Sequence, residues 1–231
     1  MSNLAIIPAR GGSKRIPRKN IKPFLGKPII SYSIEMAIQS RLFDEVMVST
    51  DDDEIADIAK KCGAKVPFKR RESSSGDFAT TTDVITEVLK DYANSGMVFS
   101  NVCCIYPAAP LIKINHLERG LNSLLNQSFF SVLPVVEFSY PIWRALETKN
   151  DERLTMIWPK FKDSRSQDLT NAYHDAGQWY WFKPDKIVDT LFTENTGYIL
   201  LKEEEVQDID NITDWKLAEL KYNLTKGEVQ N

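Results

Sequence analysis

A short basic loop near the start of the sequence has the residue types of a phosphate-binding site. It reads PARGGSKRIPRKN, Pro8 to Asn20, and follows an apolar run typical of a buried strand. Adjacent glycines let backbone N–H groups approach an anion closely, and crowded cations repel one another until an anion is bound. The first acidic residue of the chain is Glu35, so no carboxylate in the loop offsets this charge. We therefore favour a phosphate site over a solvated surface turn for this loop, which contains Arg10, Gly11, Gly12, Ser13, Lys14 and Arg15, followed by Arg18, Lys19 and Lys22.

The spacing within this loop excludes two familiar phosphate-binding motifs. The loop lacks the G-x-x-x-x-G-K-[ST] pattern of a Walker A loop and the G-x-G-x-x-G fingerprint of dinucleotide-binding folds. Its place after a buried strand still puts the cations where open α/β sheets bind their ligands.

Two aspartates far down the chain have the spacing of a metal site. Asp208 and Asp210 alternate in VQDIDN, so on an extended segment both carboxylates point to the same side. Such hard oxygen ligands suit Mg²⁺, which usually keeps several waters and also takes phosphate oxygens. From these residues alone, an acidic turn before a helix is the more common explanation.

The elements that must position these residues alternate between strand and helix in the first 130 residues. Valine- and isoleucine-rich runs predict strands at 4–8, 45–50 and 101–106, and apolar residues at helical spacing predict helices at 28–40, 55–62, 83–92 and 117–125. Strands and helices that alternate with short connections indicate an α/β fold. We expect a Rossmann-like, mostly parallel sheet with helices on both faces.

The pattern changes after about residue 131. Strands are predicted at 131–138, 154–159, 179–182 and 197–201, with a long polar connection before the third, and a last helix starts near Ile212 with Asn211 or Thr213 as its cap. We interpret 1–231 as a single domain and 131–175 as an insertion that pairs with another subunit.

The composition fits a globular protein and disfavours nucleic acid as a partner. The chain has 231 residues, a net charge of −3, 42% hydrophobic and 26% charged residues. We expect no membrane span, because no run of about 18 apolar residues occurs, and no signal peptide, because the first apolar stretch is short. Three cysteines without metal-site spacing, Cys62, Cys103 and Cys104, favour reduced core thiols and a cytoplasmic location.

The loop and several later stretches resemble one family. IIPARGGSKRIPRKNI is similar to the N-terminal motif of the CMP-sialic acid synthetases, the cytidylyltransferases that activate nonulosonic acids. In the order of that family follow FLGKPIISYSIEMA, VMVSTDDDEIADIAKKCGA, CCIYPAAPLI, SRSQDLTNAYHDAGQWYWF and VQDIDNITDW. The stretch SRSQDLTNAYHDAG looks most like the branch that makes CMP-pseudaminic acid.

The resemblance implies a nucleotidyltransferase domain with CTP and a nine-carbon sugar acid as substrates. The anomeric hydroxyl of the sugar acid attacks the α-phosphate and pyrophosphate leaves, with Mg²⁺ as cofactor. It implies that Asp208 and Asp210 hold the metal, which reverses the acidic-turn interpretation, and that Arg10, Lys14, Lys19 and Asp210 are catalytic. A homodimer is also implied.

The resemblance places further residues on the nucleotide. These are Ala9, Arg10, Gly11, Gly12, Ser13, Lys14, Asn20, Arg70, Asp77 and Thr80. Asn20 has a turn cap as its alternative role, and the stretch around Arg70 has a polar surface loop as its alternative. Asp51 and Asp52 are expected to cap the helix after the strand at 45–50.

The sugar site rests on the resemblance alone. It implies Tyr106, Arg165, Gln167, Asp168, Tyr173 and His174 near the sugar acid. Many sialic acid members carry polar residues where Tyr106, Ala108, Ala109 and Ile112 stand here, and a less polar wall suits the methyl terminus and acylamido groups of pseudaminic acid. A brace for a dimer is the alternative role of the segment around Arg165.

Two further functions compete with a pseudaminic acid cytidylyltransferase. One is a synthetase of the same enzyme class for sialic, legionaminic or another nonulosonic acid. The second is a nucleotide-binding regulatory module that has the fold but no turnover. Arg10, Lys19, Asp208 and Asp210 are all present, which disfavours the regulatory module.

Overall fold

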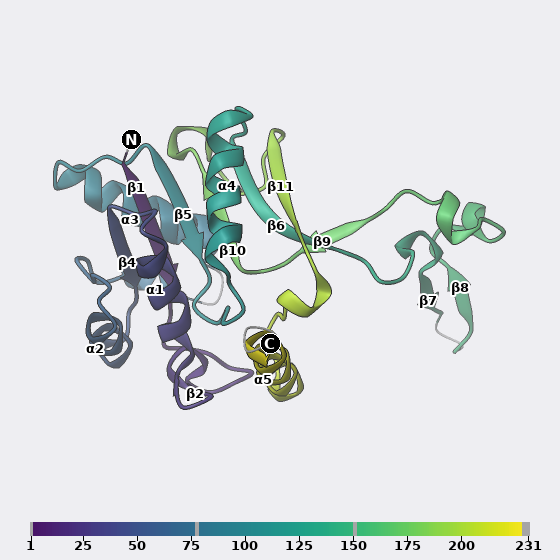
Figure 1. Cartoon of the computed structure of the whole chain (residues 1–231), viewed down its shortest axis with the longest axis horizontal. Coiled ribbons are helices and arrows are strands. Elements are labelled where there is room, and N and C mark those ends of the chain that lie inside the picture. The colour runs from purple at the N-terminus through teal and green to yellow at the C-terminus, as the bar shows by residue number, and fades with distance from the viewer. Residues whose placement is uncertain (1, 77–78, 150–151, 228–231) are drawn as a thin grey trace.

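The centre of the molecule is a seven-stranded sheet (Figure 1). The computed structural model describes residues 2–76, 79–149 and 152–227. The strand order is β11-β6-β10-β5-β1-β4, with β9 added to β6. The bounds are β1 Asn3–Pro8, β4 Glu45–Ser49, β5 Asn101–Ile105, β6 Ser131–Glu137, β9 Tyr173–Asp175, β10 Trp179–Phe182 and β11 Thr196–Leu201.

Five of the seven strands run in one direction. β1 is parallel to both β4 and β5, and β6 is parallel to β11, whereas β10 and β9 run the opposite way. The prediction of a mostly parallel sheet is confirmed. The reversal of β10 and β9 is not part of that prediction, because apolar periodicity carries no information on strand direction.

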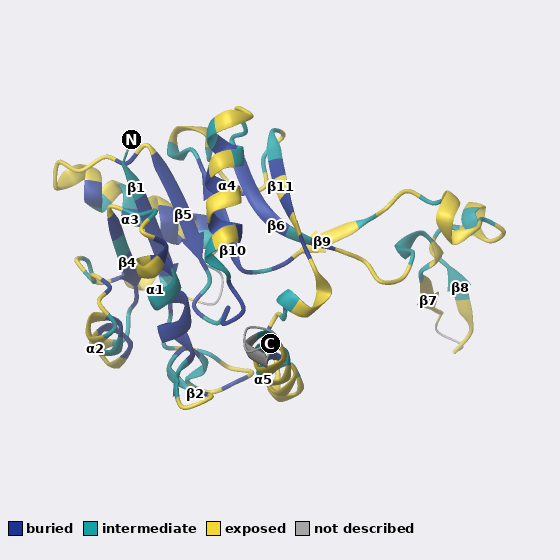
Figure 2. Cartoon of the chain, in the orientation of Figure 1, coloured by how far each residue is buried: buried dark blue, intermediate teal, exposed yellow. Residues whose placement is uncertain are grey.

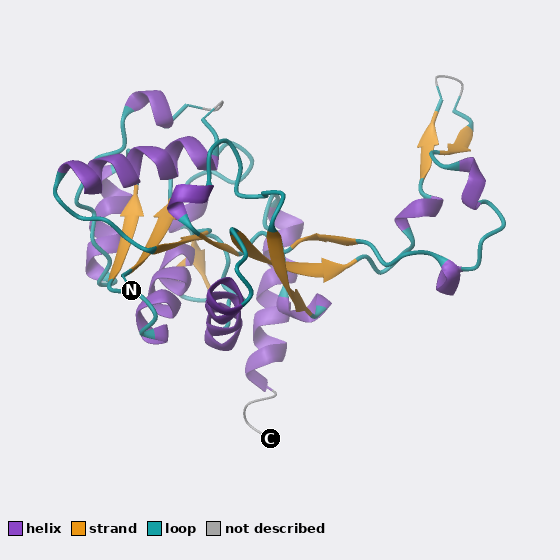
Figure 3. Cartoon of the chain, turned by 90° about the horizontal axis from the view of Figure 1, so that it is seen from above, coloured by secondary structure: helices purple, strands orange, loops and turns teal. Residues whose placement is uncertain are grey.

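Helices cover both faces of this sheet, as predicted (Figure 3). Helices α1 (Ile29–Ser40), α2 (Asp53–Lys61) and α4 (Ile114–Asn126) pack with Ala5 and Ile7 on one face, and α3 (Thr81–Asn94) packs with Leu4 and Ile6 on the other. Because successive residues of β1 point to opposite faces and all four are fully buried, the strand is a continuous apolar run. The sheet thus holds the loop after β1 on a rigid support.

Helix α5 (Ile212–Gly227) packs against the short hairpin that follows the basic loop. It buries Trp215 and Ala218 against Phe24, which belongs to the short hairpin β2 (Pro23–Phe24) and β3 (Lys27–Pro28) just after the basic loop. The Phe24 and Trp215 rings meet edge to face with centroids 5.5 Å apart. Asn211 caps α5, because its Oδ1 accepts the N–H groups of Thr213 and Asp214.

A small arm, residues 138–172, projects away from the body (Figure 1). It holds the hairpin β7 (Leu146–Thr148) and β8 (Leu154–Met156) and three 3-10 turns, Ile142–Arg144, Pro159–Phe161 and Ser166–Asp168. Its surface is largely exposed, whereas the central strands β1, β4, β5 and β10 of the body are largely buried (Figure 2). The expected insertion of 131–175 is therefore too wide: 131–137 and 173–175 are strands of the central sheet, held there by buried residues such as Val132 and Leu133.

The cysteines form no disulfide. Cys103 and Cys104 lie fully buried on β5, and Cys62 is half-buried at the end of α2. Burial raises the pKa of the Cys104 thiol to about 12. Within the described part of the chain, no helix is long and apolar enough to cross a membrane.

Candidate active site

The carboxyl ends of β1, β4 and β5 meet at one edge of the sheet, and the loop after β1 forms a pocket there. This loop pocket has a volume of about 370 Å³ and is lined by Pro8, Arg10, Ser13, Lys14, Arg15, Ile16, Lys19, Asn20, Pro107 and Asp210. Four cations and one carboxylate line it, so its charge favours an anionic ligand. The structure thus brings the predicted loop residues together with one of the two predicted metal ligands.

The glycine turn owes its shape to two aspartates that follow β4. A Cβ atom on Gly11 would lie 2.8 Å from Asp52 Oδ2, so the turn can approach Asp52 only with glycine there. The Gly11 N–H donates to Asp51 Oδ1 at 3.0 Å, and Arg18 donates to both carboxylate oxygens of Asp52. Asp52 also caps α2 by accepting the Ile55 N–H. The prediction that both aspartates cap this helix is right for Asp52 and wrong for Asp51, which holds the turn.

Asn20 and Ala9 fix the two ends of the turn. Asn20 is buried, and its Nδ2 donates to the Arg10 carbonyl oxygen at 3.0 Å. Ala9 is fully buried, and its N–H donates to the Ser49 carbonyl oxygen at 2.9 Å. Asn20 therefore braces the turn and also lines the loop pocket. At Gly12, no described atom other than those of its two chain neighbours lies within 4 Å of an added Cβ, so the backbone is open to a ligand.

The aspartate pair lies beside this turn, although Lys19 and Ile209 are 190 positions apart in the sequence. Lys19 Nζ donates to the carbonyl oxygen of Ile209 at 2.9 Å, and Arg15 Nη1 lies 2.6 Å from Asp210 Oδ2. Burial lowers the pKa of Lys19, and the charges of Asp210 and Asp208 offset part of that shift. Burial raises the pKa of Asp208, and the like charge of Asp210 adds to the effect. Cations and carboxylates of the two distant segments therefore act on one another directly.

A polar latch, formed by Lys113, Gln178 and Glu205, holds the segment that carries the aspartates, and no sequence motif predicts it. Lys113, at the start of α4, donates to Glu205 Oε1 at 2.7 Å, and Gln178 Nε2 donates to the Glu205 carbonyl oxygen at 2.7 Å. Burial opposes ionisation of Glu205, but the hydrogen bond from Lys113 helps to outweigh it, and the pKa of Glu205 is lowered. His116 is buried beside this carboxylate with its Nε2 3.7 Å from Oε1, in agreement with a structural role.

A second pocket adjoins the first. This Arg70 pocket has a volume of about 410 Å³ and is lined by Pro8, Arg10, Arg15, Arg70, Ser74, Gly76, Ala79, Thr80, Thr81, Val84 and Tyr106. Arg70 is buried, with its Nε donating to Ser49 Oγ at 3.1 Å. Thr80 caps α3 in a capping box with Asp83 and still lines the pocket. The predicted nucleotide residue Asp77 lies outside the described residues.

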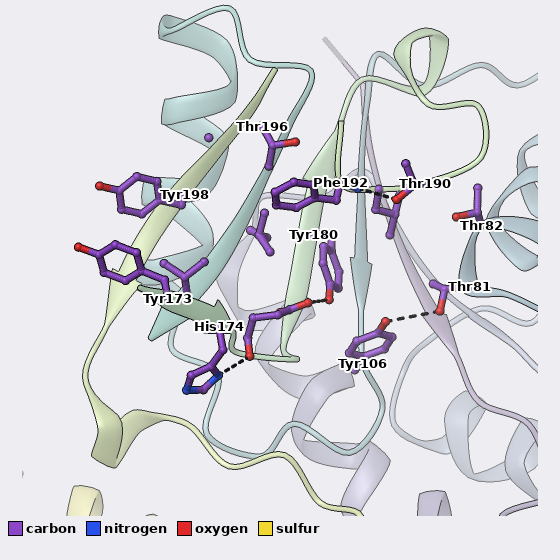
Figure 4. A pocket seen from close by; sticks show the side chains of 15 residues that line it. Thr81, Thr82, Tyr106, Tyr173, His174, Tyr180, Thr190, Phe192, Thr196 and Tyr198 are labelled. Atoms are coloured by element: carbon purple, nitrogen blue, oxygen red, sulfur yellow. Dashed lines mark hydrogen bonds between the residues drawn. The ribbon is translucent and has the colours of Figure 1, made fainter. Parts of the chain in front are cut away.

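A third pocket opens beyond Tyr106 (Figure 4). This Tyr106 pocket has a volume of about 540 Å³ and is lined by Thr81, Thr82, Tyr106, Leu133, Val135, Tyr173, His174, Asp175, Tyr180, Thr190, Leu191, Phe192, Thr196, Gly197 and Tyr198. Most of its wall is apolar or aromatic. Four polar side chains lie along one side, and we call them the polar rail: Thr81, Tyr106, Asp175 and Tyr180. The Tyr180 hydroxyl donates to Asp175, and the Tyr106 hydroxyl lies 3.5 Å from Thr81 Oγ1. Burial raises the pKa of both tyrosines, so each hydroxyl stays protonated at neutral pH.

The predicted sugar residues fall into two groups. Tyr106, Tyr173 and His174 line the Tyr106 pocket. Arg165, Gln167 and Asp168 lie on the arm, in or beside its turn at Ser166–Asp168, apart from the three pockets of the body. Within one chain these two groups are not brought together. The sequence prediction lacks Asp175 and Tyr180, because their meeting depends on β9 and β10 lying next to β6.

The fold and its pockets define an α/β protein with a cation-lined ligand site at the carboxyl edge of its sheet. The sequence profile of one family, described as cytidylyltransferase, matches residues 4–174. The chain belongs to this cytidylyltransferase family and is a nucleotidyltransferase that uses CTP.

Relatives with assigned activities cover nearly the whole chain. A pseudaminic acid cytidylyltransferase of Campylobacter jejuni subsp. jejuni serotype O:2 is 44% identical over 97% of this chain and 97% of that protein. A CMP-N,N'-diacetyllegionaminic acid synthase of Legionella pneumophila is 31% identical over 95% of each. The similarity to the CMP-sialic acid synthetases inferred from the motifs is thereby confirmed.

Solved structures support the fold. A CMP:2-keto-3-deoxy-manno-octonic acid synthetase in complex with CTP covers 98% of this chain and 100% of its own, with a TM-score of 0.69 at 17% identity. At that identity the likeness supports the fold alone.

Proposed function

We propose that this enzyme transfers CMP from CTP to the anomeric hydroxyl of pseudaminic acid and releases pyrophosphate. The observation that carries the reaction type is the meeting of the glycine turn and the Asp208–Asp210 segment at one pocket. The sugar acid is inferred from the relative that is 44% identical over nearly its full length.

The loop pocket supplies the charge that this reaction needs. Arg10, Ser13, Lys14 and Lys19 would hold the triphosphate, and the open backbone at Gly12 would let it approach. The hydroxyl oxygen forms a bond to the α-phosphorus while the bond from that phosphorus to the bridging oxygen of pyrophosphate breaks. Cations that are already in place stabilise the charge that develops, and they cost no reorganisation during the step. Asp210, the carboxylate of the pocket, is our candidate to accept the proton of the hydroxyl.

The donor set of the site suits Mg²⁺. Asp208 and Asp210 offer hard carboxylate oxygens from alternate residues next to the loop pocket. Among the described residues no group of three or more His, Cys, Asp or Glu gathers, so the protein would supply two ligands and phosphate oxygens and water the others. When bound, the ion would neutralise phosphate charge and acidify a coordinated hydroxyl.

The neighbouring pockets fit the two remaining parts of the substrates. The Arg70 pocket shares Arg10 and Arg15 with the loop pocket, so it would hold the cytidine. The Tyr106 pocket would hold the sugar acid, because its apolar wall of Leu133, Leu191 and Phe192 suits methyl and acyl groups and its polar rail suits their amide nitrogens.

A panel of sugar acids tests the substrate. The protein is incubated with CTP, Mg²⁺ and either pseudaminic, legionaminic or N-acetylneuraminic acid, and pyrophosphate release is measured. Highest kcat/KM with pseudaminic acid is expected. A higher value with another acid would reassign the substrate, and no turnover with any of them would favour a regulatory nucleotide-binding module.

We further propose a homodimer joined through the arm. Leu146 and Leu154 lie on the same face of the β7–β8 hairpin and are 55% and 64% exposed, which is costly unless a partner covers them. In such a dimer Arg165 and its neighbours on the arm could reach the Tyr106 pocket of the second copy. Light scattering of the wild type should give twice the chain mass, and Leu146→Asp should shift it to one chain mass.

We place the enzyme in the cytoplasm, where CTP is available and free thiols stay reduced.

A further inference from the structure

We propose that Arg15 is a switchable counter-ion: it neutralises Asp210 when no metal ion is bound and moves to the triphosphate when nucleotide arrives. Arg15 would thereby make the binding of CTP and of the divalent cation depend on each other. This inference rests on the proposed cytidylyltransferase function and concerns how its site is filled.

The position of Arg15 allows both partners. Its Nη1 lies 2.6 Å from Asp210 Oδ2, yet the side chain is 70% exposed and that of Asp210 is 37% exposed. Arg15 lines the loop pocket and also the Arg70 pocket. A long side chain at the junction of two pockets can leave one anion and reach another without a change in the backbone.

The charges around Asp210 make the exchange favourable. Asp208 and Asp210 are alternate carboxylates of one segment, and like charges so close to each other repel. Lys19 is anchored on the Ile209 carbonyl oxygen, whereas Arg15 contacts Asp210 through an exposed ion pair. Exposed ion pairs contribute little to stability, so a divalent cation can displace Arg15 from Asp210 readily. The displaced guanidinium is then repelled by the metal ion and attracted by a triphosphate, which guanidinium groups bind through two parallel hydrogen bonds.

Coupling of the two ligands follows from this exchange. The metal ion alone must compete with Arg15 for Asp210, and the triphosphate alone must draw Arg15 away from Asp210 while leaving that carboxylate unpaired. Each ligand removes the penalty that the other one meets, and thermodynamic linkage makes the effect reciprocal. The enzyme therefore binds neither ligand tightly without the other.

The experiment removes the charge of Arg15 and measures each ligand alone. Binding of Mn²⁺ without nucleotide and of CTP in EDTA is measured by calorimetry for the wild type and Arg15→Gln. We expect Arg15→Gln to bind Mn²⁺ about 5- to 20-fold more tightly and CTP in EDTA about 5- to 20-fold more weakly. Opposite changes are the signature, because a general loss of structure would weaken both.

Lys186→Gln is the matched control. Lys186 forms an exposed ion pair with Asp185 beyond the far end of β10, away from the pockets, and its loss should leave both affinities within about two-fold. If wild type and Arg15→Gln bind each ligand with equal affinity, or if Arg15→Gln loses affinity for both ligands, the proposed role of Arg15 is wrong while the proposed metal site still stands. A wild-type protein that binds Mn²⁺ neither alone nor with nucleotide would overturn the proposed metal site as well.

Discussion

The ammonium group of Lys19 lies 2.9 Å from the carbonyl oxygen of Ile209, the residue between Asp208 and Asp210. This hydrogen bond joins the first loop of the chain to the segment before its last helix. It places a half-buried cation between the phosphate-binding turn and the carboxylates, so one side chain both supplies charge and fixes the second half of the site.

Replacement of Lys19 should therefore impair catalysis strongly. In Lys19→Met the aliphatic stem remains while the charge and the hydrogen bond to Ile209 are lost. We expect kcat/KM for pyrophosphate release to fall by about 10²- to 10³-fold. Lys22→Met serves as the control, because Lys22 rests over the Trp215 ring, 5.7 Å from its centroid, and should lose less than about three-fold. Similar rates for Lys19→Met and the wild type would contradict the assigned role.

Asp208→Asn should stabilise the protein while it abolishes activity. The folded-state pKa of Asp208 is raised, so between the ordinary value of 3.8 and the raised one the folded state binds more protons than the unfolded state. Above that window the folded state carries a penalty for ionised Asp208, and asparagine removes it. We expect a gain of about a few tenths of a kcal/mol in unfolding free energy at pH 7 that disappears below about pH 4.

Urea titrations at the two pH values, without metal, measure this effect. Asp210→Asn is the matched comparison, because it removes the same charge repulsion but also the ion pair with Arg15. It should gain less than Asp208→Asn. A loss of stability in Asp208→Asn at pH 7 would refute the argument.

The latch at Glu205 should contribute to stability in a pH-dependent way. The pKa of Glu205 is lowered, so its contribution is present above the unfolded-state value of about 4.5 and is lost as the pH falls through the lowered one. Lys113→Met should cost about 1–2 kcal/mol of unfolding free energy at pH 7, and this cost should shrink as the pH falls through the lowered pKa of Glu205.

Lys202→Met is its control, because the pair of Lys202 with Glu204 is exposed on both sides. The same Lys113→Met variant should need more Mg²⁺ for half-maximal activity, since the aspartate segment is held less firmly. An unchanged metal requirement would show that the latch does not position the site.

The polar rail of the Tyr106 pocket should act on the sugar acid alone. Asp175→Asn keeps the oxygen that accepts the Gly177 N–H and loses the acceptor for Tyr180. We expect KM for the sugar acid to rise about 10-fold, while KM for CTP stays within about two-fold. Tyr198→Phe, at the exposed rim of the pocket, should change neither. Equal rises in both KM values would contradict the proposal that the sugar acid binds in this pocket.

The parts of the fold that depend on local pattern were predictable. The continuous apolar run of β1 and the helical spacing in α1 and α4 identify each element, because burial on both faces or on one stripe determines which residues are apolar. The turn after β1 was predictable for the same reason, since glycines and cations gather in one stretch of sequence.

Contacts that depend on strand neighbours were not predictable. The Asp175–Tyr180 pair needs β9 and β10 to run antiparallel to β6, and the Lys113–Glu205 latch joins residues 92 positions apart. For the aspartate pair, the residues alone favoured an acidic turn, and only the resemblance indicated that the pair lies beside the loop after β1. The boundaries of the expected insertion were not predictable either, because the sequence of β6 does not show that its neighbours are β10 and β11.

The docking of α5 on the hairpin after the basic loop bears on how the enzyme matures. On the ribosome the sheet strands and the basic loop emerge before Asp208 and Asp210, the residues that complete the site. We expect a nascent chain that ends before residue 206 to be folded in its body yet inert, so catalytic competence is acquired only once Asp208 and Asp210 have emerged and Trp215 packs against Phe24.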